Sequence, residues 1–282
     1  MFFAPFLSSL YMGAGAVPAM EQCKLCLNHV AKLEDSHFLS KGIYKRLRDD
    51  KEKNPNPWQI TPKTAVQTSD QMKARLLCRD CEQRFCKLGE NWVLSNCLQK
   101  DCGFPLASIL SLIPPDVSPA QNHTKLYYAS KIPEINVSAL AYFAVSIFWR
   151  GSIHPWNHDG TIPVKLGPYQ EQFRQYLLGM QAFPKDCSLC VVLREGKEID
   201  RLTYPPVGQR KGTFHLYRFP MPGLAFTLAV SRNIPPSHRE MCFVHGRGNP
   251  LFVTSCLEPL LLDEARKFVQ RHVKPHVNPF ML

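Results

Sequence analysis

Apolar residues recur at helical spacing in three stretches of the chain, residues 82–98, 136–150 and 167–180. The second stretch, NVSALAYFAVSIFWR, is apolar almost all round, which predicts a buried helix. The other two are amphipathic. Their apolar sides comprise Phe85, Leu88, Trp92 and Val93 in the first helix and Tyr169, Phe173, Tyr176 and Leu177 in the last.

From Cys187 onward the pattern changes to short β-branched and aromatic runs separated by Pro and Gly. The runs are CVVLRE, GTFHLYRF, LAFTLAV, CFVHG and LFVTSC. Runs of this length between turn residues predict an antiparallel sheet. Residues 258–273, EPLLLDEARKFVQRHV, then predict a closing helix. The expected fold class is therefore α+β.

The N-terminal third alternates short elements with loops. Residues 33–53 begin with a turn and continue as a basic helix, with Ile43 and Leu47 one helical turn apart. Residues 54–64 are rich in Pro and Asn and predict a loop. Residues 65–77 predict a strand or a hairpin.

These patterns divide the chain into an N-terminal module at 20–100, a linker at 101–123 and an α+β C-terminal domain at 124–282. Residues 1–19 are apolar, but no Lys or Arg precedes the apolar run, as a secretory signal requires. We interpret them as a leader or as an over-extended start. The longest apolar run elsewhere, near 139–149, is too short to span a bilayer, so we expect a soluble protein without membrane contact.

The composition indicates the charge of the expected partners and the cellular compartment. The chain has 282 residues with 34 Lys and Arg against 23 Asp and Glu, a net charge of +11. Such an excess favours polyanionic partners, nucleic acid first, although plain solubility is the alternative. Eleven cysteines in a chain this long favour metal binding over a disulfide scaffold, and hence a reducing, cytoplasmic location.

Four of the cysteines form two C-x2-C pairs, Cys23 with Cys26 and Cys78 with Cys81. Four thiolates form the closed tetrahedral ligand set of structural zinc. The alternative is a set of buried free thiols. Zinc bound in this way has no open coordination position, so any chemistry must come from other residues.

Other candidate groups lie between and after the two pairs. His37 stands between them in Asp35-Ser36-His37, and Glu82, Cys86 and Glu90 share one face of the predicted helix at i, i+4 and i+8. If the His37 segment packs against that face, an imidazole meets two carboxylates. Such a set could hold Mg²⁺, Mn²⁺ or Zn²⁺ while the histidine takes a proton from water.

The segments CKLC, SHFL and LLCRDCE together resemble the HNH endonuclease family in its cysteine-clamped form, over roughly residues 20–95. The resemblance implies a zinc-clamped ββα-metal (treble-clef) module, followed here by a helical segment and a β-rich region. It also implies metal-dependent hydrolysis of phosphodiesters, with His37 as general base, Glu82 at the helix position that often supplies a metal ligand, and Mg²⁺ or Mn²⁺ as catalytic ion. Bacterial defence and mobile elements are the usual setting of such nucleases.

The sequence departs from the family pattern at two positions. The family has an acid directly before its histidine, where this chain has Ser36, and Asp35 should point to the opposite face of a strand. The helix position is usually His or Asn, whereas this chain has Glu82. These departures keep open a second hypothesis, in which the module is a non-catalytic zinc-containing domain that binds nucleic acid or regulates. His37 is then a structural histidine, and Glu82 favours the helix N-terminus.

Basic residues flank the same segments and could hold a phosphate backbone. The candidates are Lys41, Lys45, Arg46, Arg48, Arg79 and Arg84. A solvated helix face is the alternative. We expect DNA as partner, with RNA as the other candidate, while the C-terminal region positions substrate, senses a trigger or binds a protein activator.

A further C-x2-C and a C-x2-H could form a second zinc site. They are Cys187 with Cys190 and Cys242 with His245. Both segments look like strands, so buried thiols on a sheet are the simpler interpretation.

Overall fold

The structure is a computed structural model. It describes residues 20–48, 50, 53–60, 65–97, 104–118, 124–156, 162–194, 202–203 and 205–254. The predicted leader at 1–19 and the predicted closing helix at 258–273 lie outside the described residues. None of the described helices is both long and apolar enough to cross a membrane.

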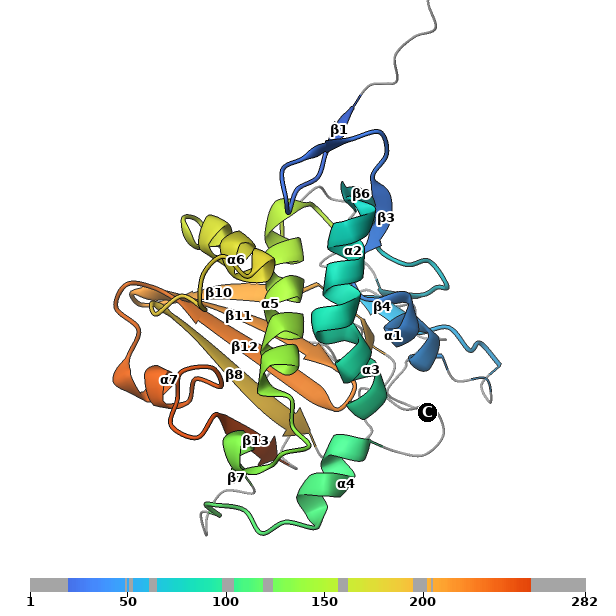
Figure 1. The fold of residues 1–282 in the computed structure, drawn as a ribbon. Helices are drawn as coiled ribbons and strands as arrows, with labels where there is room; N and C mark the ends of the chain where they lie inside the picture. The colour runs from blue at the N-terminus through green and yellow to red at the C-terminus, as the bar shows by residue number, and fades with distance from the viewer. Residues whose placement is uncertain are drawn as a thin grey trace, which may run out of the picture.

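A six-stranded sheet forms the larger part of the molecule (Figure 1). Its strand order is β10-β11-β12-β8-β13-β7. The strands are β7 (Thr124–Tyr128), β8 (Cys187–Arg194), β10 (Val207–Lys211), β11 (Phe214–Met221), β12 (Leu224–Val230) and β13 (Pro250–Thr254). All neighbours are antiparallel except β13 and β8, which run parallel. The predicted antiparallel sheet is thus correct apart from this pair, which is formed because the chain crosses over through α7 (Pro236–Glu240) before it re-enters the sheet. The run CFVHG is also an exception, because its residues lie in turns after α7 and form no strand.

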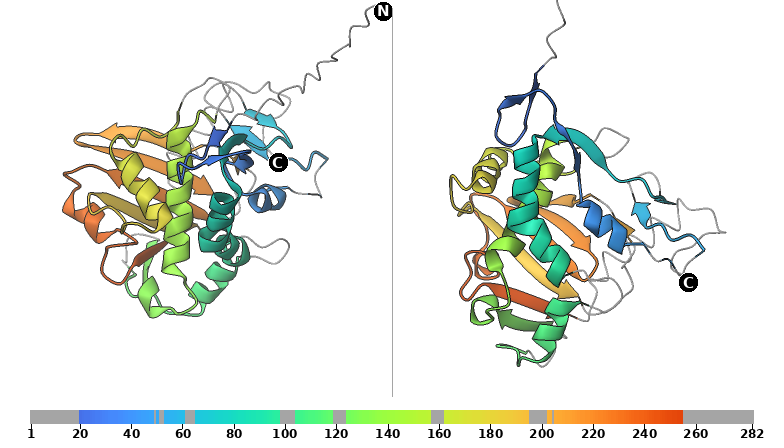
Figure 2. Two further views of the ribbon diagram at one scale, coloured as in Figure 1. Left: turned by 45° about the horizontal axis from the view of Figure 1, so that its top comes forward. Right: turned by 45° about the vertical axis from the view of Figure 1, so that its right-hand side comes forward.

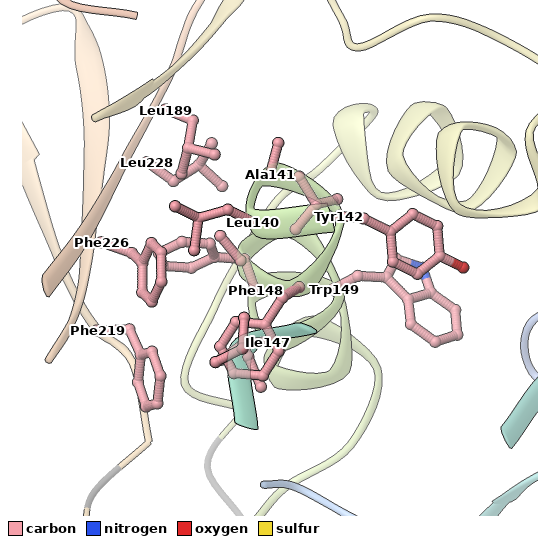
Figure 3. Packing of buried hydrophobic residues seen from close by; sticks show 14 of the residues in the cluster. Leu140, Ala141, Tyr142, Ile147, Phe148, Trp149, Leu189, Phe219, Phe226 and Leu228 are labelled. Carbon is pink, nitrogen blue, oxygen red and sulfur yellow. The ribbon is translucent and has the colours of Figure 1, made fainter. Parts of the chain in front are cut away.

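One helix, α5 (Val137–Ile153), lies across the face of this sheet (Figure 1). Its Leu140 and Phe148 point toward Phe226 of the sheet, whereas Trp149 and Tyr142 point away from it (Figure 3). On that second side α5 contacts the helices of the N-terminal region and α6 (Tyr169–Leu178). Because α5 is covered on both sides, its sequence is apolar all round, as predicted.

The helix after the second cysteine pair is continuous from Arg79 to Asn96. It comprises α2 (Arg79–Phe85), the π-helical turn η1 (Cys86–Glu90) and α3 (Asn91–Asn96). It begins three residues before the predicted start at Glu82, because Cys78 already serves as its N-cap. The π-helical turn alters the phase of the following residues, and Leu88 is 43% exposed instead of buried as predicted.

Gly89 in this turn allows the helix to approach α5 closely. A Cβ atom at this position would lie 2.9 Å from the backbone nitrogen of Phe143. Real Cβ contacts are longer than this, so glycine is the residue that the approach requires.

The N-terminal region consists of small strands and one short helix beside α2. Two pairs of antiparallel strands, β1 with β2 and β3 with β6, precede α2, and Figure 2 shows the first pair at one end of α2. We call the pair of β3 and β6 the hairpin, although α1, β4 and β5 lie between its strands in the sequence. The bounds are β1 (Glu21–Gln22), β2 (His29–Val30), β3 (Glu34–His37), α1 (Lys41–Arg46), β4 (Trp58–Ile60), β5 (Ala65–Gln67) and β6 (Lys73–Leu77). Ile43 and Leu47 are buried, as the helical spacing predicts.

Two expectations for loops are wrong. The predicted loop at 54–64 contains β4, which pairs with β5 and also, in parallel, with the distant β9 (Leu202–Thr203). The predicted linker at 101–123 contains α4 (Pro105–Ser111), whose Leu106 and Leu110 are buried in the core. Of the two strands that pair with β4, β5 follows it directly whereas β9 lies far away in the sequence. The remaining element, η2 (Ala129–Lys131), follows β7.

One large cluster of buried apolar side chains extends from Cys23 to Val253. It includes residues of the N-terminal module, of α4 and of the large sheet. The N-terminal module and the predicted C-terminal domain therefore share one core. The division of the chain into these two domains stays a prediction.

Candidate metal centre and adjoining charged cluster

The first cysteine pair lies in the tight turn between β1 and β2. The backbone N–H of Cys23 donates to the carbonyl oxygen of Asn28 at 2.9 Å, and Leu27 adopts a left-handed conformation with φ of 65°. The N–H of Lys24 donates to the carbonyl oxygen of Leu76 in β6, also at 2.9 Å. This last bond fixes the turn beside the end of β6, where the second pair begins.

The second pair spans the junction between β6 and α2. Cys78 is the N-cap of α2 and Cys81 lies in its first turn, so both thiols project from the start of the helix. The sulfur atoms of all four predicted ligands, Cys23, Cys26, Cys78 and Cys81, lie within 4.8 Å of one another. The sequence prediction of a four-cysteine group that could hold a metal such as zinc is therefore correct.

The spacing of these sulfurs suits a tetrahedral zinc site. Zinc–sulfur bonds of roughly 2.3 Å place tetrahedral sulfurs about 3.8 Å apart, and Sγ of Cys26 lies 3.8 Å from Sγ of Cys78. The backbone N–H of Cys78 also donates to Sγ of Cys23 at 3.3 Å. Backbone N–H groups directed at a thiolate sulfur stabilise its charge.

The four thiols share protons unequally without a metal. A hydrogen bond from the Cys81 thiol and the N–H of Cys78 lower the pKa of Cys23 to about 4, although burial opposes this shift. The same contact with Cys23, together with burial, raises the pKa of Cys81. One negative charge is thus preferred at Cys23, and a bound dication would favour the thiolate form of all four.

His37 is the last residue of β3, on the hairpin that precedes α2. Its side chain is half-buried, and burial followed by the charges of Lys73 and Lys41 lowers its pKa. The imidazole is therefore neutral at neutral pH. A neutral imidazole is the form that can accept a proton.

The two residues before His37 have separate surroundings. Ser36 is fully buried, and its Oγ accepts a hydrogen bond from the N–H of Leu77 at 3.2 Å. Asp35 lies on the opposite face of the strand, as predicted, where its carboxylate is 3.7 Å from Nζ of the exposed Lys73. Asp35 is therefore directed away from the side chains that surround Ser36.

Glu82 projects from the first turn of α2 toward the hairpin. It bonds to the Ser36 side chain, and burial raises its pKa while Arg150 and Ser36 lower it. Its Oε1 is buried without a hydrogen-bond partner among the described residues. A buried carboxylate oxygen of this kind favours a cation or a donor beside it.

Glu90 is paired with Arg150, near the C-terminal end of α5. Its Oε1 lies 2.7 Å from Nη2 of Arg150, and its Oε2 accepts a weak hydrogen bond from the Cys86 thiol at 3.5 Å. Both charged side chains are almost fully buried. The shared face predicted for Cys86 and Glu90 is thus correct, and that face is directed at α5.

Arg150 joins the hairpin to the helix. Its Nη1 donates to the carbonyl oxygen of Phe38 at 3.1 Å, and its guanidinium lies 4.6 Å from the ring centre of Phe85. Its charge also acts on His37 and Glu82, whose pKa values it lowers. We call the following set the charged cluster: Ser36, His37, Glu82, Cys86, Glu90 and Arg150.

The sequence contains one signal for the pairing of Arg150. It is the lone charged residue in the apolar helix NVSALAYFAVSIFWR. A charge on a helix that is buried all round must be paired. The partner, however, lies 60 residues away in the sequence, and no local pattern identifies it.

The ligand atoms of the three predicted catalytic residues do not meet as those of the cysteines do. Among the described residues, only the four cysteines form a group of three or more His, Cys, Asp or Glu side chains whose ligand atoms all lie within 4.8 Å of one another. His37, Glu82 and Glu90 form no such group. Their catalytic role stays a prediction.

The predicted phosphate-binding residues divide into two sets. Lys41, Lys45 and Arg48 line a hollow of about 340 Å³ beside α1, together with Tyr44 and Gln71. The charge of Lys41 reaches His37. This hollow therefore combines three cations with proximity to the charged cluster.

The other three cations are placed differently. Arg84 donates from Nε to the carbonyl oxygen of Leu177 at 2.8 Å and from Nη2 to that of Leu178 at 2.5 Å, so it caps the C-terminus of α6. Nη1 of Arg46 is buried without a partner among the described residues. Arg79 is exposed. Arg84 thus serves helix packing.

The second candidate zinc site is not formed by the described side chains. Cys242 and His245 lie in the turns after α7, so the expectation that their segment is a strand is wrong. Cys187 is buried and Cys190 half-buried on β8, and Nε2 of His245 lies 3.1 Å from the carbonyl oxygen of Phe183.

Comparisons with known proteins return no relative: no protein-family model, no curated protein and no solved structure matches this chain. The interpretation of the two clusters therefore rests on their geometry and chemistry.

Proposed function

We propose that this protein is an HNH-type endonuclease that hydrolyses phosphodiester bonds of nucleic acid, DNA first and RNA as the alternative. The observation that carries the proposal is the arrangement around Arg150. Its buried guanidinium donates to the carbonyl oxygen of Phe38, the residue after His37, and to the carboxylate of Glu90 on the helix that begins beside Glu82. A neutral imidazole, a carboxylate and a fixed cation from three separate segments are typical of a hydrolytic site.

The order of elements supports the same proposal. A turn with two cysteines, a strand that ends at His37, and a helix that begins at two more cysteines follow one another along the chain, which is the order that the resemblance implies for a treble-clef module. In this arrangement Zn²⁺ would be held by the four thiolates and would stabilise the fold. The chemistry would take place at the charged cluster beside it.

We assign the following roles. His37 accepts the proton of the attacking water, because burial and nearby cations keep its imidazole neutral. Lys41, Lys45 and Arg48 hold the phosphate backbone in the basic hollow. Arg150 supplies a fixed positive charge, and Glu90 holds Arg150 in place.

A second metal fits this site incompletely. The buried, unpartnered Oε1 of Glu82 suits a cation, but Glu90 is already paired with Arg150 and no third ligand converges among the described residues. Mg²⁺ needs several oxygen ligands and often takes them from water and substrate phosphate. The side chains alone do not build the predicted Mg²⁺ or Mn²⁺ site, and we assign no step to such an ion.

The test is cleavage of supercoiled plasmid and of single-stranded RNA by the purified full chain, with EDTA, Mg²⁺ or Mn²⁺. His37→Ala should lower the rate by about 10²–10⁴-fold, the usual contribution of a general base. His29→Ala is the matched control, because His29 is an exposed histidine on β2 of the same module. All variants must first bind equal amounts of zinc.

Loss of cleavage in His37→Ala, but not in His29→Ala, supports the nuclease. Equal cleavage by all three chains assigns the activity to another site or to a contaminant and contradicts the proposal.

A second candidate function is a non-catalytic nucleic-acid-binding module. The buried ion pair of Arg150 and Glu90 favours it, since such a pair can simply stabilise packing between hairpin, helix and α5. Salt-sensitive binding of DNA without cleavage under any metal condition would select this candidate. Lys45→Ala should then weaken binding similarly for all sequences, because phosphate contacts carry no sequence information.

A further inference from the structure

Arg174 of α6 reaches the turn that carries the first cysteine pair. Its Nη1 donates to the carbonyl oxygen of Leu25 at 2.5 Å, although the two residues are 149 positions apart in the sequence. Figure 2 shows this turn beside α6. The side chain of Arg174 is only 12% exposed, so water competes little for the bond. A helix of the C-terminal region thus contacts the candidate metal centre directly.

Glu171, on the same helix, holds the guanidinium in position. Nε and Nη2 of Arg174 each donate to one carboxylate oxygen of Glu171 at 2.7 Å. Gln175 donates from Nε2 to the same carboxylate, also at 2.7 Å. These bonds, with that of Arg174 as the strongest, lower the pKa of Glu171 to about 2. A two-point contact of this kind fixes the plane of the guanidinium and so directs Nη1 at Leu25.

The carbonyl group that Arg174 binds belongs to a peptide unit whose other end faces a cysteine sulfur. This other end is the N–H of Cys26, and because the peptide is planar, a bond that holds the oxygen of Leu25 also fixes the direction of this N–H. The pKa of Cys23 is lowered first by the Cys81 thiol and then by backbone N–H groups, among them that of Cys26. Arg174 therefore holds a peptide whose N–H is directed at Sγ of Cys23.

The charge of Arg174 also acts on the cysteine cluster. A zinc ion with four thiolates carries a net charge of about −2, which is costly to bury. Glu171 is the main group that raises the pKa of Arg174, and the charge of Cys26 raises it further. The same attraction favours the thiolate form of Cys26. A fixed cation at this place offsets part of the charge of a zinc-loaded centre.

We propose that Arg174 positions the first cysteine pair for metal binding, so that α6 increases the affinity of the four-cysteine centre for zinc. Arg174 offers no ligand atom to the metal. It acts through the peptide between Leu25 and Cys26 and through its charge, as other groups that hydrogen-bond around metal ligands do. This role requires the cysteine centre but not phosphodiester cleavage, so it goes beyond the proposed function.

The zinc dissociation constant of the full chain tests this role. It is measured by competition with a chelator of known affinity at constant pH. Arg174→Gln should raise the dissociation constant by about 10–100-fold, the usual effect of removing a group that orients a metal ligand. Circular dichroism of the zinc-loaded variant must first show that it is folded.

Two other arginines separate positioning from packing and from charge alone. Arg84 also joins the N-terminal module to α6, through the carbonyl oxygens of Leu177 and Leu178. Arg84→Gln should lower the free energy of unfolding but change the zinc dissociation constant by less than about twofold. Arg79 is an exposed cation that lines a hollow beside the same cysteines. Arg79→Gln should weaken zinc binding far less than Arg174→Gln, because water and salt screen an exposed charge.

Cobalt in place of zinc provides a measurement that packing alone does not change. The energy of the thiolate-to-cobalt charge-transfer band depends on how strongly hydrogen bonds and nearby charges stabilise the sulfurs. Arg174→Gln weakens the hydrogen bond to Cys23 and removes the cation near Cys26, so the band should shift to lower energy. Arg84→Gln should leave the band unchanged.

Equal zinc dissociation constants in the unmodified chain and in Arg174→Gln overturn the proposal, and so does an unmodified chain that binds no zinc. An equal loss of affinity in Arg84→Gln also overturns it, because a loosened α6 would then explain both variants. Weaker zinc binding with an unshifted cobalt band contradicts it as well, since the sulfurs would be unaffected. Because cleavage is measured in none of these experiments, failure of the nuclease proposal leaves their outcome unchanged.

Discussion

The two clusters beside α2 differ in how they are assembled. The four cysteines come from two short turns, are chemically identical and converge within 4.8 Å. The residues of the charged cluster come from the hairpin, from α2 with its π-helical turn and from α5. Some of them are hydrogen-bonded, as Arg150 and Glu90 are, whereas Oε1 of Glu82 has no hydrogen-bond partner among the described residues. A closed ligand set can be recognised from local spacing, whereas a mixed site depends on the whole core.

The largest expected effect comes from breaking the cysteine cluster. Cys78→Ser should reduce bound zinc from about one ion per chain to none and abolish cooperative unfolding of the N-terminal module, because structural zinc contributes about 10–16 kcal/mol. Elemental analysis and thermal unfolding by circular dichroism measure this. Cys190→Ser, a half-buried cysteine outside the cluster, should retain zinc. Full zinc content in Cys78→Ser would refute the assignment of this ligand.

The next largest effect is expected from breaking the buried ion pair of the charged cluster. Arg150→Met leaves Glu90 charged and unpaired in the core, which should lower the free energy of unfolding by about 3–5 kcal/mol. The double variant Arg150→Met/Glu90→Leu should recover most of this loss, since it removes both charges. Urea unfolding of the two single variants and the double variant provides the thermodynamic cycle. Additive losses would mean that the two residues stabilise the fold independently.

An intermediate loss of stability is expected where the π-helical turn η1 approaches α5 closely. Gly89→Ala places a methyl group 2.9 Å from the backbone nitrogen of Phe143, which cannot move freely. We expect a loss of about 1–3 kcal/mol, as for other overpacked sites. Gly42→Ala in α1 is the matched control, because its methyl group would meet only the movable end of the Leu94 side chain. Urea unfolding should rank Gly89→Ala as clearly less stable than this control.

The smallest effect sharpens the contrast between buried and exposed charges. Lys73 and Asp35 lie 3.7 Å apart on the same hairpin as His37, but both are more than half exposed. Lys73→Ala should change the free energy of unfolding by less than about 1 kcal/mol. A loss as large as that of Arg150→Met would show that burial is not what separates the two ion pairs.

The sequence predicts well what depends on local spacing. The cysteine pairs, α5, α6 and the burial of Ile43 and Leu47 all follow from periodicity or fixed intervals. The errors concern elements held by distant partners. β4 pairs with β9 about 140 residues later, and the extra helix α4 is stabilised by the shared core.

The charged cluster shows the same limit. His37 and Glu82 are visible as candidates because they flank the cysteines, yet the buried cation Arg150, whose charge acts on both, comes from a distant helix. The pairing of Glu90 with Arg150 could not be predicted, because a buried charge signals only that a partner exists. It does not identify which acid is the partner.

The position of β13 has a consequence for the order of folding. This last described strand lies inside the sheet, between β8 and β7, and its register joins Thr254 to Thr124. Contacts so far apart in the chain form slowly, because long loops must close first. During synthesis, β7 and β8 therefore remain without their common neighbour until residue 254 has left the ribosome. Until then each of the two strands has an open edge, which is a site for mispairing with other chains.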